Sequence, residues 1–226
     1  MYKKFPAARP DFFMLESNFE SRKNTQEEEK QRKFLEWLGN ELKNYEAIFN
    51  LSDEDLRDKK ILEIGAGDRR FAATCILNNI TREVYSLEPA LSGEDKPGYA
   101  SQGFLDKVME GLPADMRRKI EEKTLVTTAE QIPVEKDSFD LVIGRSVPFE
   151  NIEQLENRLR ELFRVGKEIR LYPVHTDNYS AMNIALNEVA KDLKFNVQFK
   201  TIVEEDIKTE DGIQHIQEDV VILRKN

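Results

Sequence analysis

The sequence predicts an α/β protein with a doubly wound, mostly parallel sheet of seven strands, a C-terminal antiparallel hairpin and an N-terminal helical extension. Between about residues 60 and 194, short apolar runs alternate with helical patterns, which is typical of parallel strands joined by crossover helices. Two longer strand-like runs follow, and the turn-rich residues 208–212 between them favour a hairpin. The chain of 226 residues is long enough for one well-buried core.

The first 58 residues are highly charged, and their apolar side chains recur at helical spacing. In three- and four-residue steps, the apolar stripe joins Phe34, Trp37, Leu38, Leu42, Tyr45, Ile48 and Phe49. Glu41 falls on the same stripe. Because such a stripe lets one helix face pack on a core, we expect residues 1–58 to form a helical extension that packs on an α/β domain of residues 59–226.

Each element of that domain follows from its own local pattern. The parallel strands are expected at residues 60–64, 83–87, 124–128, 139–144 and 168–173, and the hairpin strands at 196–203 and 219–224. Helices are expected near residues 70–78, within 101–122, and at 151–163 and 180–193. The glycine- and proline-containing stretch 91–123 predicts two short helices that form a flap beside the ligand crevice.

Charge and composition limit the kinds of partner and the cellular compartment that we expect for this protein. The net charge is −9 and the isoelectric point is about 5.0, which makes a nucleic-acid partner unlikely because a broad basic face is needed to bind one. No apolar run approaches the roughly 20 residues that span a bilayer. The single cysteine, Cys75, permits no intrachain disulfide. We expect a cytoplasmic protein that acts on a small molecule or a protein, without a membrane partner; its oligomeric state stays open.

Two closely spaced glycines directly follow the first expected strand. The segment reads Glu63-Ile64-Gly65-Ala66-Gly67-Asp68. A chain that leaves the carboxyl end of a central strand must turn sharply, and a ligand can approach bare backbone only where side chains are absent. The crevices at the strand ends of open α/β sheets bind ligands, so this loop is the first candidate site.

Four motifs in order resemble those of the class I S-adenosylmethionine (AdoMet)-dependent methyltransferases. The glycine loop is similar to motif I of that family, and the strand ending in Leu87-Glu88-Pro89 resembles its second, acid-terminated strand. The family's third loop and fourth strand are resembled by Thr128-Ala129-Glu130-Gln131-Ile132-Pro133 together with Asp137-Ser138-Phe139-Asp140-Leu141-Val142. The segment that leads into its fifth strand is resembled by Glu161-Leu162-Phe163-Arg164-Val165-Gly166. Each motif is weak alone, but their order favours the family.

The resemblance implies AdoMet as the cofactor and assigns roles to four groups of residues. Glu88 would accept hydrogen bonds from the ribose hydroxyls, since a carboxylate can take two. The glycine loop would approach the methionine and ribose portion, and Ala129 the adenine. The residues expected to bind the cofactor are Glu63, Gly65, Ala66, Gly67, Asp68, Glu88, Pro89, Thr128, Ala129, Glu130 and Arg145.

Two positions depart from the family pattern. Arg69 stands where the family usually has a third glycine. Its side chain reaches solvent, or Arg69 or Arg70 binds an anion such as the methionine carboxylate or an acidic substrate, or the loop no longer binds the cofactor. Thr128 replaces an aspartate that many relatives carry, and a hydroxyl is a weaker partner for an adenine amino group.

The chemistry of methyl transfer asks little of the protein beyond alignment of the nucleophile, desolvation and sometimes a base. His175, which follows the fifth expected strand, is the candidate general base; the alternative is a loop histidine without a role. No spacing of ligand side chains predicts a metal site. The sequence thus favours a methyltransferase with an unidentified acceptor, and the alternative is a catalytically inactive binding module with the same fold.

Overall fold

The computed structural model describes residues 11–92, 102–145, 152–172, 179–209 and 212–225. The chain forms two compact units, Met1–Trp37 and Leu38–Asn226. Helix α1 (Asp11–Phe49) runs through both of them. In the first unit its exposed surface carries ion pairs between residues three or four apart, such as Lys33 with Glu29 at 2.8 Å, which are typical of a solvated helix. The expected extension that ends at residue 58 stays a prediction.

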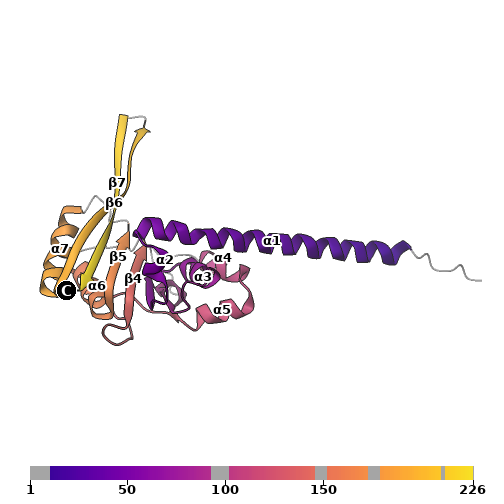
Figure 1. Cartoon of the computed structure of the whole chain (residues 1–226), viewed down its shortest axis with the longest axis horizontal. Coiled ribbons are helices and arrows are strands. Elements are labelled where there is room, and N and C mark those ends of the chain that lie inside the picture. Colours follow the sequence, from indigo (N-terminus) through magenta and orange to yellow (C-terminus); the bar gives the residue numbers. More distant parts are fainter. Residues whose placement is uncertain (1–10, 93–101, 146–151, 173–178, 210–211, 226) are drawn as a thin grey trace, which may run out of the picture. The chain divides into compact units, whose positions relative to one another are not determined.

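One seven-stranded sheet organises the second unit, in the order β3-β2-β1-β4-β5-β7-β6 (Figure 1). Its strands are β1 (Ile61–Ile64), β2 (Val84–Leu87), β3 (Thr124–Leu125), β4 (Phe139–Arg145), β5 (Gly166–Tyr172), β6 (Phe195–Thr209) and β7 (Gly212–Lys225). The first five strands are parallel, and β7 is antiparallel to both β5 and β6. The predicted fold class is confirmed.

Helices cover both sides of this sheet. They are α2 (Asp53–Leu56), α3 (Arg70–Leu77), α4 (Gln102–Gly111), α5 (Ala114–Glu121), α6 (Ile152–Val165) and α7 (Tyr179–Asp192), with a short 3₁₀ turn η1 (Pro89–Ser92). Figure 1 shows α6 and α7 on one side of the sheet and α3 and α5 on the other. Right-handed crossovers that run in opposite directions from the central strand β1 place helices on opposite faces, so the sheet is doubly wound.

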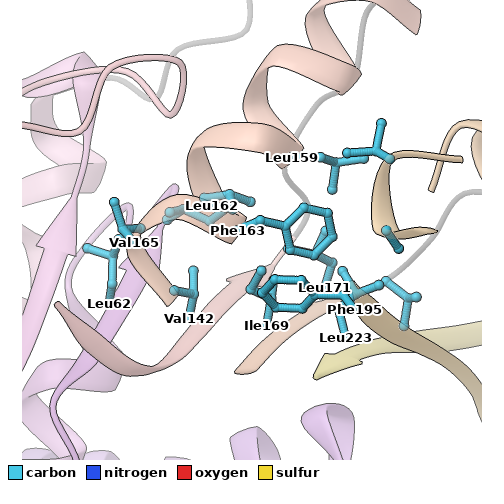
Figure 2. Close-up of a cluster of buried hydrophobic side chains, with 14 of the residues drawn as sticks. Leu62, Val142, Leu159, Leu162, Phe163, Val165, Ile169, Leu171, Phe195 and Leu223 are labelled. Carbon is cyan, nitrogen blue, oxygen red and sulfur yellow. The ribbon is translucent and has the colours of Figure 1, made fainter. Parts of the chain in front are cut away.

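A cluster of buried apolar side chains lies between α6, α7 and the centre of the sheet (Figure 2). Leu62 and Val142 come from adjacent parallel strands and are fully buried. Phe163 of α6 packs on Phe195 of β6, with ring centroids 4.1 Å apart. Strands that are buried on both faces read as continuous apolar runs, which is why the sequence located β1 and β4 closely.

Helix α6 passes into β5 without a loop, because α6 ends at Val165 and β5 begins at Gly166. A Cβ atom at Gly166 would lie 2.6 Å from Cγ2 of Val142 and 3.3 Å from the carbonyl oxygen of Leu162. Both neighbours belong to the packed core. The sharp junction therefore requires glycine at this position, for space rather than for backbone conformation.

A buried arginine of β5 caps the C-terminus of α1. Arg170 is 1% exposed, and its Nη1 donates to the carbonyl oxygens of Phe49, at 2.8 Å, and of Asn50. Its Nε donates to Oε1 of Glu168 at 2.6 Å. The last carbonyls of a helix lack partners within the helix and carry partial negative charge, so this cation satisfies the end of α1 and binds it to the sheet.

The two C-terminal strands are longer than their expected ranges. Strand β7 pairs with β5 only from Val221 to Arg224, but it pairs with β6 from Lys225 out to Gly212. Strands β6 and β7 therefore continue past β5 as a two-stranded ribbon, visible in Figure 1. The sequence pattern missed the outer part because charged residues interrupt its apolar runs. Strand β3, in contrast, is shorter than its expected range.

Within the described ranges, no helix combines the length and the apolar composition that crossing a membrane requires.

Candidate functional site

The glycine loop turns at the carboxyl end of β1 through three residues with positive φ. These angles are 64° at Gly65, 52° at Gly67 and 59° at Arg69. Glycine adopts such angles freely, whereas other L-residues are strained by about 1–2 kcal/mol. Hydrogen bonds hold the turn, from Ala66 N to the Leu87 carbonyl at 3.1 Å and from Arg69 N to the Ala66 carbonyl at 2.9 Å. The loop therefore lies directly beside the end of β2.

Glu88, at the end of β2, faces this loop with both carboxylate oxygens engaged. Its Oε2 accepts from Gly67 N at 2.7 Å, and its Oε1 accepts from Ala90 N at 3.0 Å. The residue is 6% exposed, and Pro89 begins η1 directly after it. Each carboxylate oxygen can accept a second hydrogen bond, so Glu88 holds the loop and keeps capacity for a hydroxyl donor.

Glu63, in β1, carries a buried carboxyl group. It is 3% exposed, and its Oε2 has no hydrogen-bond partner among the described residues. Burial raises the pKa of this carboxyl well above its ordinary value, and the nearby charges of Asp68 and Glu88 raise it further, against Arg145 and Arg70. A buried polar atom without a partner costs free energy, which points to a ligand donor at this position.

Asp68 is held in place by the residue that starts the next helix. Its Oδ2 accepts from Arg70 Nη2 at 2.9 Å, and its Oδ1 accepts from Arg70 N at 3.3 Å. Arg70 Nη1 also donates to Oε2 of Glu41, in α1, at 3.0 Å. Arg70 is thus engaged by two carboxylates.

The side chain of Arg69 turns inward, toward α4. It is 5% exposed, so the expectation that it reaches solvent is wrong. Its Nη2 donates to the carbonyl of Leu105 at 2.9 Å and lies 3.7 Å from Oδ1 of Asp106. Both partners belong to α4, so the arginine binds the glycine loop to the helix that follows β2.

The third group of expected cofactor residues follows β3. Ala129 is buried, whereas Thr128 is exposed. Partial burial opposes ionisation of Glu130, but hydrogen bonds from Arg158 of α6 and from Thr128 outweigh it and lower the pKa of Glu130. Glu130 is therefore occupied by protein partners.

A pair of residues on α6 fixes the loop that continues from there. Glu161 Oε1 accepts from Ile132 N at 2.8 Å. Arg164 donates to the carbonyl of Ile132 at 2.8 Å, to that of Val134 at 2.7 Å, and to Glu161. These contacts give the Glu161–Val165 motif a structural role, because it holds the loop between β3 and β4 in place.

The remaining expected residues lie at or beyond the ends of β4 and β5. Arg145 is the last residue of β4 and is exposed, and its charge opposes the raised pKa of Glu63. His175 lies outside the described residues. Within the described ranges, no group of His, Cys, Asp and Glu side chains is arranged to hold a metal ion.

The structure thus brings together the ends of β1, β2 and β4, with Glu63, Asp68, Glu88 and Arg145 around the glycine loop. Glu41 and Tyr45 of α1 also lie near this loop, and the sequence pattern did not predict them there. Tyr45 is 5% exposed. Burial raises its pKa well above the ordinary value, and so do Glu63 and Asp68, which lie near it. One feature of the sequence could have indicated this role of α1: Glu41 is a charged residue on an otherwise apolar helical stripe.

Comparison with solved structures identifies the architecture. A proposed RNA methyltransferase from Pyrococcus horikoshii matches with a TM-score of 0.52 and 16% identity, covering 83% of this chain and 82% of the other. Magnesium protoporphyrin IX methyltransferase from Synechocystis PCC 6803, with bound AdoMet, matches with a TM-score of 0.50 and 12% identity, covering 88% and 79%. The fold is that of the class I AdoMet-dependent methyltransferases.

No protein-family model matches the chain, and no curated protein sequence matches it. In the methyltransferase fold, as in other open α/β sheets, the ligand crevice lies at the carboxyl ends of the strands. The glycine loop, Glu63, Glu88 and Arg145 all lie at that edge.

Proposed function

We propose that this protein is an AdoMet-dependent methyltransferase whose acceptor is a small molecule or a protein. The observation that supports this most directly is the pair of buried carboxylates, Glu63 and Glu88, around a glycine loop in the methyltransferase fold. AdoMet carries an ammonium group, a sulfonium and two ribose hydroxyls, so it offers donors and positive charge to an acidic crevice.

The residues present fit the cofactor. Oε2 of Glu63, which has no partner in the described part of the chain, is an acceptor for the ammonium group, and a cation there would favour the ionised carboxylate. Glu88 retains lone pairs for the ribose hydroxyls while it fixes Gly67. We assign adenine contact to Ala129, with Thr128 and Glu130 beside it, and a contact with the methionine end to Arg145. When bound, AdoMet would supply an electrophilic methyl group on its sulfonium.

The deciding measurement is isothermal titration calorimetry of the full chain with AdoMet and with S-adenosylhomocysteine. We expect saturable binding of both, and at least about tenfold weaker binding by Glu88→Ala, since a carboxylate hydrogen bond contributes about 1.5–3 kcal/mol. The matched control is Glu83→Ala, an exposed glutamate just before β2, which should bind as the wild type does. Absence of binding of both ligands would refute the proposal.

Turnover separates the enzyme from an inactive binding module of the same fold. Transfer of radiolabelled methyl groups to a metabolite extract or to a protein extract is the expected result. Binding without transfer to any fraction would instead favour the binding module. His175 is the proposed general base, and the variant His175→Ala should lower the rate of transfer without changing the affinity for AdoMet.

The acidic charge of the chain disfavours nucleic acid as the acceptor. The chain carries a net −9, and nucleic-acid binding depends on neutralising phosphates with basic residues. A similar fold belongs to a proposed RNA methyltransferase, so total RNA belongs in the same assay. Labelled RNA would overturn this part of the proposal. We also propose a cytoplasmic location, which fractionation with a compartment marker tests.

A further inference from the structure

Helix α1 contributes one carboxylate, Glu41, to a contact with the glycine loop. Its Oε2 lies 3.0 Å from Nη1 of Arg70, and the two side chains are only 14% and 22% exposed. Its Oε1 accepts from Nδ2 of Asn44 at 3.1 Å. Both oxygens of Glu41 therefore accept hydrogen bonds. The ion pair is also shielded from water, and a shielded ion pair is stronger than one on an exposed surface.

Arg70 extends the contact to the turn itself. Its second terminal nitrogen lies 2.9 Å from Oδ2 of Asp68, a carboxylate with only 6% of its side chain exposed. Asp68 stands between Gly67 and Arg69, which both have positive φ. A chain of two ion pairs thus runs from α1 to the middle residue of the turn, so the position of α1 and the position of the loop backbone depend on each other.

Two further contacts place the same helical segment beside the site. The carbonyl of Gly39 accepts from Nδ2 of Asn78, at the end of α3, at 3.0 Å. The ring of Tyr45 lies 4.8 Å from that of Phe71, in the first turn of α3. Gly39, Glu41 and Tyr45 of α1 therefore contact α3, the helix that begins at the glycine loop.

We propose that Glu41 is a positioning residue of the cofactor site, acting through Arg70 and Asp68, and that α1 must be folded from Leu38 onward for AdoMet to bind tightly. This inference rests on the proposed function. Without Glu41, Arg70 loses the ion pair that joins it to α1, so Asp68 and the turn are held less firmly in one arrangement. Binding would then include the cost of ordering the loop.

The test compares three variants of the full chain. Glu41→Ala removes the acceptor, and Glu41→Gln restores a neutral one. Glu36→Ala is the matched control, because Glu36 belongs to the same helix and forms an exposed pair with Arg32 at 3.8 Å. Affinity for AdoMet is measured by calorimetry at a temperature where circular dichroism shows each variant folded.

The expected result is a loss of about tenfold or more in affinity for Glu41→Ala, recovery to within about threefold for Glu41→Gln, and no change for Glu36→Ala. Hydrogen exchange supplies a second readout. Adding AdoMet should protect the amides of residues 38–49 in the wild type, and this added protection should be lost in Glu41→Ala.

Three results would overturn the inference. Wild-type affinity in Glu41→Ala, even with a lower melting temperature, shows that Glu41 is structural only and leaves the proposed function standing. Equal loss of affinity in Glu36→Ala shows a general charge effect. A wild-type chain that does not bind AdoMet refutes both the proposed function and the role of Glu41, and this result is distinct because it appears before any variant is made.

Discussion

At the scale of single residues, the buried carboxyl of Glu63 has the clearest consequence. Burial, then Asp68 and Glu88, raise the pKa of this group in the folded state above the ordinary value of 4.5. A group with a raised folded pKa contributes stability below its unfolded pKa, and this contribution is lost as the pH rises through the folded pKa. The ionised form of Glu63 therefore destabilises the unliganded protein.

The variant Glu63→Gln removes this titration. We expect the free energy of unfolding of the variant, relative to that of the wild type, to increase as the pH rises above 4.5. The increase is at most about 1.4 kcal/mol per pH unit, because one proton is involved. Urea unfolding of both proteins without ligand, between about pH 5 and 8, measures the gap. Parallel pH profiles would contradict a buried, strongly shifted Glu63.

Arg69 has a strained backbone with positive φ, and its side chain donates a stabilising hydrogen bond to Leu105. Two variants separate these effects. Arg69→Ala loses the bond to Leu105 and keeps a non-glycine residue at φ 59°. Arg69→Gly loses the same bond and relieves the strain. We expect both variants to be less stable than the wild type, with Arg69→Gly the more stable of the two by about 1 kcal/mol in urea unfolding. The reverse order would exclude left-handed strain at this position.

At the scale of elements, the junction of α6 and β5 depends on the absence of one methyl group. We expect Gly166→Ala to lower the free energy of unfolding by about 1–3 kcal/mol, because the added Cβ overlaps Val142 in the core. Gly39→Ala is the matched substitution, since no atom lies within 4 Å of its added Cβ. It should instead stabilise α1 by about 0.5–1 kcal/mol. Similar effects from both substitutions would show that packing is not the cause.

At the scale of the whole molecule, stability should fall along the β6–β7 ribbon. Residues Val221–Leu223 of β7 lie between two strands, whereas the outer residues pair only with each other. An isolated two-stranded hairpin is marginally stable in water. Native-state hydrogen exchange should therefore show faster exchange at 204–208 and 213–217 than at 221–223. Uniform protection along β7 would contradict this gradient.

Those parts of the molecule that depend on residues close together in the sequence could be predicted from it. Apolar runs located the five parallel strands, and the glycine pair with Glu88 located the loop and its neighbour at the end of β2. The bonds from Arg170 to Phe49 and from Arg70 to Glu41 join residues 121 and 29 positions apart. Periodicity carries no information about such pairs, so neither the cap of α1 nor its contact with the glycine loop could be predicted.

The cap of α1 also sets an order of events during synthesis. Helix α1 is synthesised before the sheet, but the side chain that binds its last carbonyl is made 121 residues after Phe49. At roughly 5–20 residues per second, Arg170 follows about 6–24 seconds later. Until then the carbonyl oxygens of Phe49 and Asn50 lack the guanidinium that they accept from in the folded protein. The end of α1 therefore gains its buried arginine only after the glycine loop and strands β1–β4 have already been synthesised.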